Sequence, residues 1–186
     1  MNKTKFNFSI TLIFILIFIS FGCSKDVKVE ENKTIENNSN VQTAQTKDVK
    51  AAPAFSLEST DGKTISLKDY KGKIVILDFW ATWCGPCRRG IPDLVSLQDK
   101  YKNDLRVIGI SLDSDTKSDV ILFAKKFNIN YPILYGDQQV TQDYGGIEAI
   151  PTTIVIDQNG EIVAKYVGLV NKETFAKQIE ALKSKS

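Results

Sequence analysis

The hydropathy of the chain changes twice along its 186 residues. Residues 6–21 are almost entirely apolar and follow two lysines, a pattern typical of an export signal that ends at Gly22. Residues 24–50 are rich in Lys, Glu, Asp, Asn, Thr and Gln and contain no aromatic residue. Such a segment cannot bury enough apolar surface to offset the entropy lost on ordering. Residues 51–186 carry the periodic apolar patterns of a folded domain, so we expect one domain of ordinary size there.

Within residues 51–186 the apolar pattern predicts strands that alternate with helices. Near-continuous apolar runs are typical of buried strands, and apolar positions three and four residues apart are typical of helices packed on a core. Turn sequences at 60–63 and 157–160 predict a β-hairpin near each end. The predicted strands span 55–57, 64–67, 73–80, 105–112, 133–135, 152–156 and 161–167, and the predicted helices span 86–101, 118–127, 139–144 and a closing helix that includes Phe175, Ile179 and Leu182. This order predicts an α/β domain, and Pro92 should kink its first helix.

A cysteine, Cys23, directly follows the apolar stretch. The segment Ser-Phe-Gly-Cys that it ends resembles the cleavage box of bacterial lipoproteins, whose cysteine is acylated and becomes the new N-terminus. Gly22 fits that pattern, whereas Ser20 stands where an aliphatic residue is usual. An uncleaved membrane anchor is the alternative, although the apolar run is shorter than the about 20 residues that span a bilayer. Either way we expect residues 1–22, a lipoprotein-type signal peptide, to direct export. Residues 23–50 should then tether the domain to a membrane in the cell envelope, outside the cytoplasm.

Charge and composition exclude several classes of function. The chain has 24 Lys and Arg residues against 22 Asp and Glu. Because Lys3 and Lys5 leave with the signal, the mature protein is close to neutral and carries no basic cluster, which argues against nucleic-acid binding. The chain has no histidine, so hydrolases that use Ser–His or Cys–His pairs and His-based metal sites are excluded. Arg88 follows Cys87 where a c-type haem motif has histidine. We therefore expect no metal, no cofactor and a monomer.

Two cysteines, Cys84 and Cys87, follow a predicted buried strand and stand at the start of a predicted helix. The free N–H groups and the dipole of a helix N-terminus stabilise a thiolate, so the pKa of Cys84 should be lowered. Cys87 lies one turn deeper on the same face, where it can attack a mixed disulfide formed on Cys84. The alternative is a static structural disulfide, although so short a loop gains little stability from closure. With Cys23 acylated, no third thiol competes for the pair.

Asp78 and Pro151 are further candidate site residues. Asp78 lies within an apolar run six residues before Cys84. Burial would raise its pKa and suit it to accept the proton of Cys87, while the alternative is a carboxylate at the strand end that faces solvent. Pro151 precedes a buried strand, where proline is ordinary. A cis Ile150–Pro151 bond is rare from sequence alone, but it would aim backbone polar groups at the cysteines.

The segment Trp-Ala-Thr-Trp-Cys-Gly-Pro-Cys at 80–87 resembles the active site of the thioredoxin superfamily. The layout of residues 51–186 resembles the TlpA-like exported branch, which includes membrane-tethered thiol–disulfide oxidoreductases. The resemblance implies a thioredoxin fold with an N-terminal β-hairpin and a helix-and-strand insertion at about 112–146. It also implies that Pro151 is cis and helps to bind substrate, and that Trp83 shapes the surface around the first cysteine.

The resemblance further implies that Asp78 is the buried acid of the site. Two departures from the family pattern limit what else can be carried over. Gly90 stands where members that reduce apocytochrome c often have a glutamate, which weakens an assignment to cytochrome maturation. Cytosolic thioredoxins have a lysine on the next strand near the acid, whereas residues 105–112 carry only Arg106. We therefore expect Asp78 to lack a cationic partner.

These observations predict an extracytoplasmic thiol–disulfide oxidoreductase that acts mainly as a reductase. Gly85-Pro86 is the dipeptide of thioredoxin, whose potential of about −270 mV is that of a reductant. The expected partners are disulfide-bonded exported proteins and a membrane thiol-transfer protein as electron donor, because the chain has no nucleotide or flavin motif. One alternative is a thiol peroxidase, although the pattern Pro-x-x-x-Thr-x-x-Cys is absent around Cys84. Another is a non-catalytic binding lipoprotein with an inert dithiol.

Overall fold

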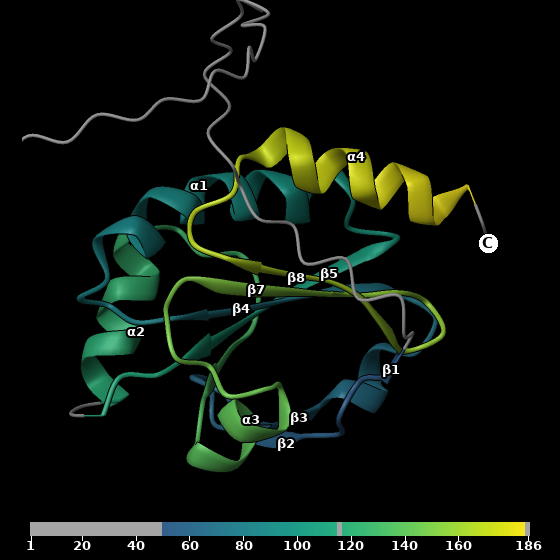
Figure 1. The fold of residues 1–186 in the computed structure, drawn as a ribbon. Coiled ribbons are helices and arrows are strands. Elements are labelled where there is room, and N and C mark those ends of the chain that lie inside the picture. Colours follow the sequence, from purple (N-terminus) through teal and green to yellow (C-terminus); the bar gives the residue numbers. More distant parts are fainter. Residues whose placement is uncertain (1–49, 115–116, 185–186) are drawn as a thin grey trace, which may run out of the picture. The chain divides into compact units, whose positions relative to one another are not determined.

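The structure is a computed structural model that describes residues 50–114 and 117–184 (Figure 1). The expectations for the signal peptide, for Cys23 and for most of the tether lie outside these residues. Within the described part of the chain, no helix is both long enough and apolar enough to cross a membrane.

A six-stranded mixed sheet forms the centre of the domain, in the order β1-β8-β7-β4-β5-β6. Strand β4 runs parallel to β5, and β5 runs parallel to β6, while β7 and β8 are antiparallel to their neighbours. Strands β2 and β3 form a separate hairpin. The strands are β1 (Lys50–Ala51), β2 (Ser56–Glu58), β3 (Thr64–Ser66), β4 (Ile74–Trp80), β5 (Leu105–Ser111), β6 (Ile133–Tyr135), β7 (Thr152–Ile156) and β8 (Glu161–Val167). The predicted α/β class, with its N-terminal hairpin, is confirmed.

Helices cover both faces of the sheet. Figure 1 shows α1 and α4 above the sheet, and α3 below it together with β2 and β3. The helices are the 3-10 helix η1 (Leu67–Tyr70), α1 (Gly85–Lys100), α2 (Lys117–Lys126), α3 (Gln138–Asp143) and α4 (Lys172–Lys183). The predicted insertion corresponds to α2, β6 and α3, and β6 extends the sheet by one strand beyond β5.

The side chains of β4 alternate between two apolar cores. Ile74 and Ile76 pack in the core that includes residues of α1 and α4. Val75 and Leu77 pack in the core on the other face, which includes residues of β2 and α3. Asp78, two positions after Ile76, therefore points to the side of α1 and α4, where the cysteines lie.

Two elements differ from the predictions. Strand β1 was not predicted, because two residues that pair with β8 leave no periodic apolar pattern. Lys50, the last residue of the predicted tether, is part of it and pairs with Ile162. The 3-10 helix η1 was not predicted either. One of its few sequence signals is a serine followed three residues later by an acidic residue. The carboxylate of Asp69 accepts a hydrogen bond from the Ser66 N–H at the start of this helix. Helix α1 contains Pro92 and continues through it to Lys100, while the kink at Pro92 stays a prediction.

Candidate active site

Cys84 stands between the end of β4 and the start of α1, and it is bonded to Cys87 in a disulfide. Cys84 is the N-cap of α1, and its Sγ accepts a hydrogen bond from the Cys87 N–H at 3.2 Å. Pro86 lies in the first turn, where its missing N–H leaves no helical bond unmade. Both cysteines are buried, with 4% and 2% of their surface exposed. The sulfur of Cys84 thus occupies the position in which a helix N-terminus stabilises a thiolate.

The segment before β7 approaches the disulfide from a distant part of the chain. The Ile150–Pro151 peptide bond is cis. The Sγ of Cys84 lies 3.7 Å from the carbonyl oxygen of Ile150, which can accept a hydrogen bond from the thiol after reduction. The carbonyl of Pro151 accepts a hydrogen bond of 2.7 Å from the N–H of Gly168, which follows β8. The structure therefore brings Pro151 to the cysteines and links it to the start of the β8–α4 connection.

Asp78 is buried, with 4% of its surface exposed, which rules out the solvent-facing alternative. Desolvation raises its pKa from 3.8 to about 7, and a hydrogen bond that the Thr153 hydroxyl donates at 3.2 Å opposes part of this rise. Neither contribution comes from a cation. Its neighbour on β5 is Gly109, while the side chain of Arg106 stacks on Tyr70. The carboxyl group can therefore be either neutral or charged near pH 7.

A small cleft of about 20 Å³ brings Asp78 and Cys87 to a common space. It is lined by Asp78, Cys87, Gly90, Leu94, Pro151, Thr153, Gly168, Leu169, Val170 and Phe175. A volume of this size accommodates about one water molecule. Asp78 and Cys87 therefore both line a space that one water molecule can fill.

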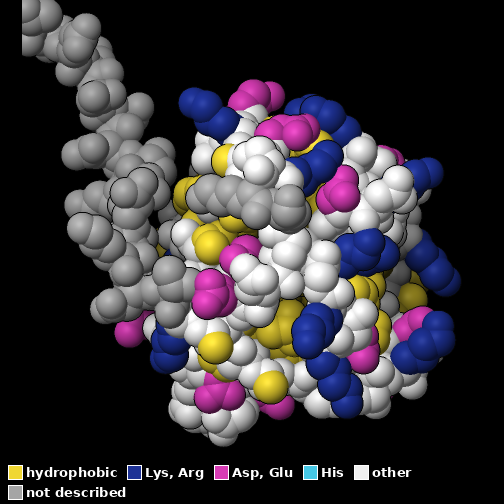
Figure 2. Space-filling view, turned by 90° about the vertical axis from the view of Figure 1, so that its right-hand side faces the viewer, with side chains coloured by type: hydrophobic (Ala, Val, Ile, Leu, Met, Phe, Trp, Pro, Cys, Tyr) yellow, Lys and Arg dark blue, Asp and Glu magenta, His cyan; other side chains and the backbone are white. Residues whose placement is uncertain are grey.

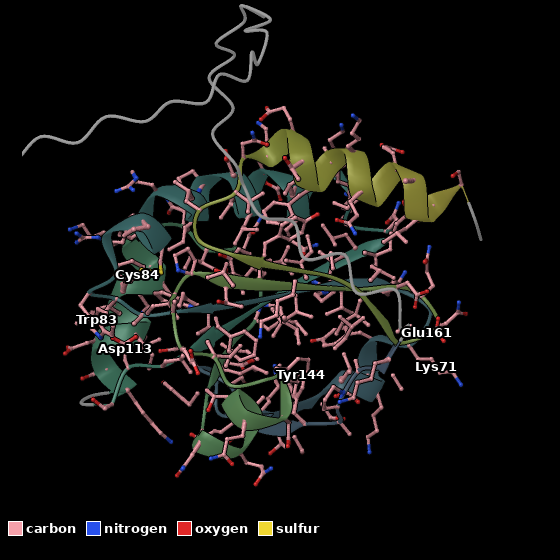
Figure 3. The ribbon with its side chains drawn as sticks, viewed as in Figure 1. Lys71, Trp83, Cys84, Asp113, Tyr144 and Glu161 are labelled. Atoms are coloured by element: carbon pink, nitrogen blue, oxygen red, sulfur yellow. A yellow bond between two sulfur atoms is a disulfide. The ribbon has the colours of Figure 1, made fainter. Side chains whose placement is uncertain are left out.

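Trp83 is the most exposed of the large apolar side chains in the described residues, with 69% of its surface open to solvent. The residue before it is held by Asp113, whose carboxylate accepts hydrogen bonds from the Thr82 N–H at 3.0 and 3.1 Å and from the Thr82 hydroxyl at 2.5 Å. The Ser111 hydroxyl donates a further bond of 2.8 Å to Asp113. Figure 3 shows Trp83, Cys84 and Asp113 at the same end of the sheet. Asp113 thus fixes the turn that presents Trp83 beside the dithiol.

Three residues of this site were not predicted from sequence: Thr153, Asp113 and Leu169. Thr153 lies in β7, Asp113 follows β5, and Leu169 follows β8. Only Asp113 had a usable signal, since an acidic residue directly after a buried strand that neighbours the cysteine strand can reach the adjacent turn. Thr153 and Leu169 look like ordinary strand and loop residues.

Metal ions and nucleic acid are two other classes of ligand, and each needs a characteristic set of side chains. Between residues 50 and 184, leaving aside 115 and 116, no group of three or more His, Cys, Asp or Glu side chains is placed to hold a metal ion. The face drawn in Figure 2 intersperses Lys and Arg with Asp and Glu side chains. That face therefore presents no uniformly basic surface of the kind that binds nucleic acid.

Sequence comparison relates the chain to thioredoxin-like proteins and thiol-disulfide oxidoreductases. The AhpC/TSA family matches residues 49–165. The thioredoxin-like protein YneN of Bacillus subtilis is 37% identical over 131 residues, which cover 69% of this chain and 76% of YneN. The thiol-disulfide oxidoreductase ResA of Geobacillus thermodenitrificans is 34% identical over 133 residues, which cover 71% of this chain and 76% of that protein.

Structure comparison agrees. A thiol:disulfide interchange protein of the thioredoxin family from Chlorobium tepidum superposes with a TM-score of 0.68 and 32% identity, over 74% of this chain and 98% of that one. A DsbF homologue from Corynebacterium diphtheriae superposes with a TM-score of 0.71 and 27% identity, over 80% of this chain and 98% of that one.

Proposed function

Because the chain belongs to the AhpC/TSA family of thioredoxin-like proteins and is a thiol–disulfide oxidoreductase, we propose that it reduces protein disulfides through Cys84 and Cys87 outside the cytoplasm. The observation that carries the proposal is the disulfide at the N-terminus of α1, beside a buried acid and a cis proline. The Gly85-Pro86 dipeptide, shared with thioredoxin, favours reduction over oxidation.

In the first step the Cys84 thiolate attacks one sulfur of a substrate disulfide. A new S–S bond joins Cys84 to the substrate, the substrate S–S bond breaks, and the other substrate sulfur leaves as a thiolate that takes up a proton. The dipole and N–H groups of α1 stabilise the attacking thiolate. The exposed ring of Trp83 and the backbone around Pro151 supply the surface on which the substrate chain lies.

In the second step Cys87 resolves the mixed disulfide. Its proton passes to the Asp78 carboxylate through the cleft, and the resulting thiolate attacks the Sγ of Cys84. The Cys84–Cys87 disulfide forms, the bond to the substrate breaks, and the second substrate sulfur leaves as a thiolate that takes up a proton, so the substrate is fully reduced. The dithiol has then lost the two electrons that the substrate gained, so an external thiol donor must reduce it before another cycle.

We further propose the cellular setting that the sequence supports. Residues 1–22 act as a lipoprotein signal peptide, Cys23 carries the lipid, and residues 23–50 tether the thioredoxin domain of residues 51–186 to the membrane. The protein works as a monomer, takes electrons from a membrane thiol-transfer protein and delivers them to disulfide-bonded exported proteins. The likeness to the thiol-disulfide oxidoreductase ResA supports the disulfide exchange in this proposal.

The test is insulin reduction with dithiothreitol as the electron source, using the full chain. Cys84→Ser should abolish turnover, whereas Cys23→Ser should retain turnover and lose the membrane fraction, so the two cysteine variants control for each other. Cys87→Ala should accumulate a mixed disulfide, which mass spectrometry of trapped complexes from the cell envelope identifies. Full activity of Cys84→Ser would refute the assignment.

A thiol-peroxidase activity is the second candidate, favoured by the AhpC/TSA match itself. Against it stands the pairing of Cys84 with a partner only three residues away, which forms a dithiol centre. The turnover rates of the purified protein with peroxide and with insulin distinguish the two functions. Faster turnover of peroxide would favour the peroxidase.

A further inference from the structure

Leu169 occupies a defined place in the connection between β8 and α4. The preceding residue, Gly168, has φ +92°, a conformation that side-chain-bearing residues rarely adopt. The N–H of Gly168 donates its 2.7 Å hydrogen bond to the carbonyl of Pro151. The bond to Pro151 ties the position of Leu169, the next residue, to the proline segment beside the dithiol.

The side chain of Leu169 packs on Gly90 of α1. A Cβ atom placed on Gly90 would lie 3.1 Å from Cδ1 of Leu169, closer than an ordinary van der Waals contact. The leucine therefore fills the space that a side chain at position 90 would take. Gly90 is the position at which, by the family resemblance, members that reduce apocytochrome c often have a glutamate, and the structure places a bulky apolar group directly against it.

Leu169 also stands at the mouth of the cleft that Asp78 and Cys87 share. Of the residues that line this cleft, Leu169 alone is exposed, with 45% of its surface open to solvent. The two reactive groups, by contrast, are almost completely buried. A side chain that faces both solvent and the cleft separates the two.

We propose that Leu169 is a positioning residue that closes the outer mouth of this cleft and limits the access of bulk water to Asp78 and Cys87. The inference rests on the proposed role of Asp78 as the proton acceptor. With Leu169 in place the cleft accommodates about one water molecule, so the proton that leaves Cys87 stays with the carboxyl group. Without it, bulk water solvates the carboxylate.

The other groups that face Asp78 do not supply a competing charge. Thr153 of β7 contributes a hydroxyl, and Cys87 of α1 contributes its sulfur. Tyr131 contributes a phenol whose pKa is raised well above 10, chiefly by burial, so it is neutral. The neighbour on β5 is Gly109, and the β8–α4 connection and α4 contribute apolar side chains and glycine. Solvent access is therefore the main influence on the pKa of Asp78 that a change at the cleft mouth can alter.

The direct test is a carboxyl ¹³C NMR titration of the oxidised full chain, with the Asp78 signal assigned through Asp78→Asn. Leu169→Ala should lower the Asp78 pKa by about one pH unit or more, a tenfold change in its ionisation equilibrium. Leu169→Met, which keeps the volume, should restore the wild-type value. Leu122→Ala removes another exposed leucine, from α2, and should leave the titration unchanged.

The variant Gly90→Ala and the pH profile of insulin reduction test the same role of Leu169. Gly90→Ala puts a methyl group against Leu169, which displaces its side chain outward and should lower the Asp78 pKa in the same direction by less. The pH profile of insulin reduction should move to lower pH in Leu169→Ala. Unchanged Asp78 titrations in both Leu169→Ala and Gly90→Ala would overturn the inference while leaving the oxidoreductase function intact. Loss of the function would appear instead as a wild-type protein that does not reduce insulin, whatever the titrations show.

Discussion

Replacing Asp78 with asparagine should make the folded protein more stable at pH 8 than the wild type, because the wild-type carboxylate is charged there in a buried, largely desolvated site. The unfolded chain loses the Asp78 proton near the ordinary pKa of 3.8, and the folded protein loses it near pH 7. Between these values the folded state binds more protons, so the wild-type free energy of unfolding falls as the pH rises and becomes level above pH 7. The pKa difference corresponds to about 4 kcal/mol as an upper bound.

Asparagine has no proton to lose, so the variant lacks this slope. The Thr153 hydroxyl can still donate to its amide oxygen, and any remaining mismatch is independent of pH. Urea unfolding of the oxidised full chain between pH 4 and 9, with the disulfide kept intact, measures the effect. The free-energy difference between Asp78→Asn and wild type should grow with pH toward about 4 kcal/mol and level off above neutrality.

Asp61 offers a matched control. It is exposed, and its pKa is lowered to about 2, chiefly by the hydrogen bond from Lys63. The stability that it contributes is present above the unfolded pKa and is lost only as the pH falls through about 2, so Asp61→Asn should run parallel to wild type between pH 5 and 9. Parallel curves for Asp78→Asn over the same range would refute a raised pKa at Asp78.

Three further predictions concern the supports of the site. Asp113→Ala should lower the free energy of unfolding by about 1–3 kcal/mol and slow insulin reduction, because the Thr82 N–H loses its acceptor; denaturant titration and the turnover assay check this. Thr153→Val removes the hydrogen bond that lowers the Asp78 pKa, so the carboxyl titration should move to higher pH by NMR. Gln98→Leu leaves a buried backbone N–H of β5 without its 2.9 Å acceptor and should destabilise the fold by about 1–3 kcal/mol in urea without moving that titration.

The chemical centre could be predicted because its evidence is local. The two-residue spacing of Cys84 and Cys87, the strand before them and the helix after them lie within consecutive residues. Asp78 stood out because a carboxylate inside an apolar run either is buried at a cost in free energy or lies at the strand end and faces solvent. The cis state of Pro151 was expected from the family resemblance, since the sequence alone leaves cis a small minority.

The residues that hold the site in place could not be predicted because they join segments that are distant in the sequence. Thr153 lies 75 positions from the acid that it contacts, and Asp113 lies 31 positions from Thr82. Leu169 depends on a glycine conformation and on a bond to the proline segment, neither of which leaves a periodic signal. Long strands and helices were predicted for the opposite reason, since each repeats its pattern over several residues, whereas β1 has only two.

Replacing Asp78 should raise the stability of the fold and lower the rate of the reaction. These opposite effects argue that the residue serves the reaction. Asp78→Asn should gain stability at pH 8 and, having lost the proton acceptor, should turn over insulin more slowly. A group retained only for structure would lose stability when replaced by its neutral isostere. The Thr153 hydroxyl is the one hydrogen-bond donor among the contributions that set its pKa, and no cation is among them, so the burial of Asp78 is only partly offset. The same reasoning extends to Leu169, because a leucine at the mouth of a cleft preserves the burial that makes the acid useful near neutral pH.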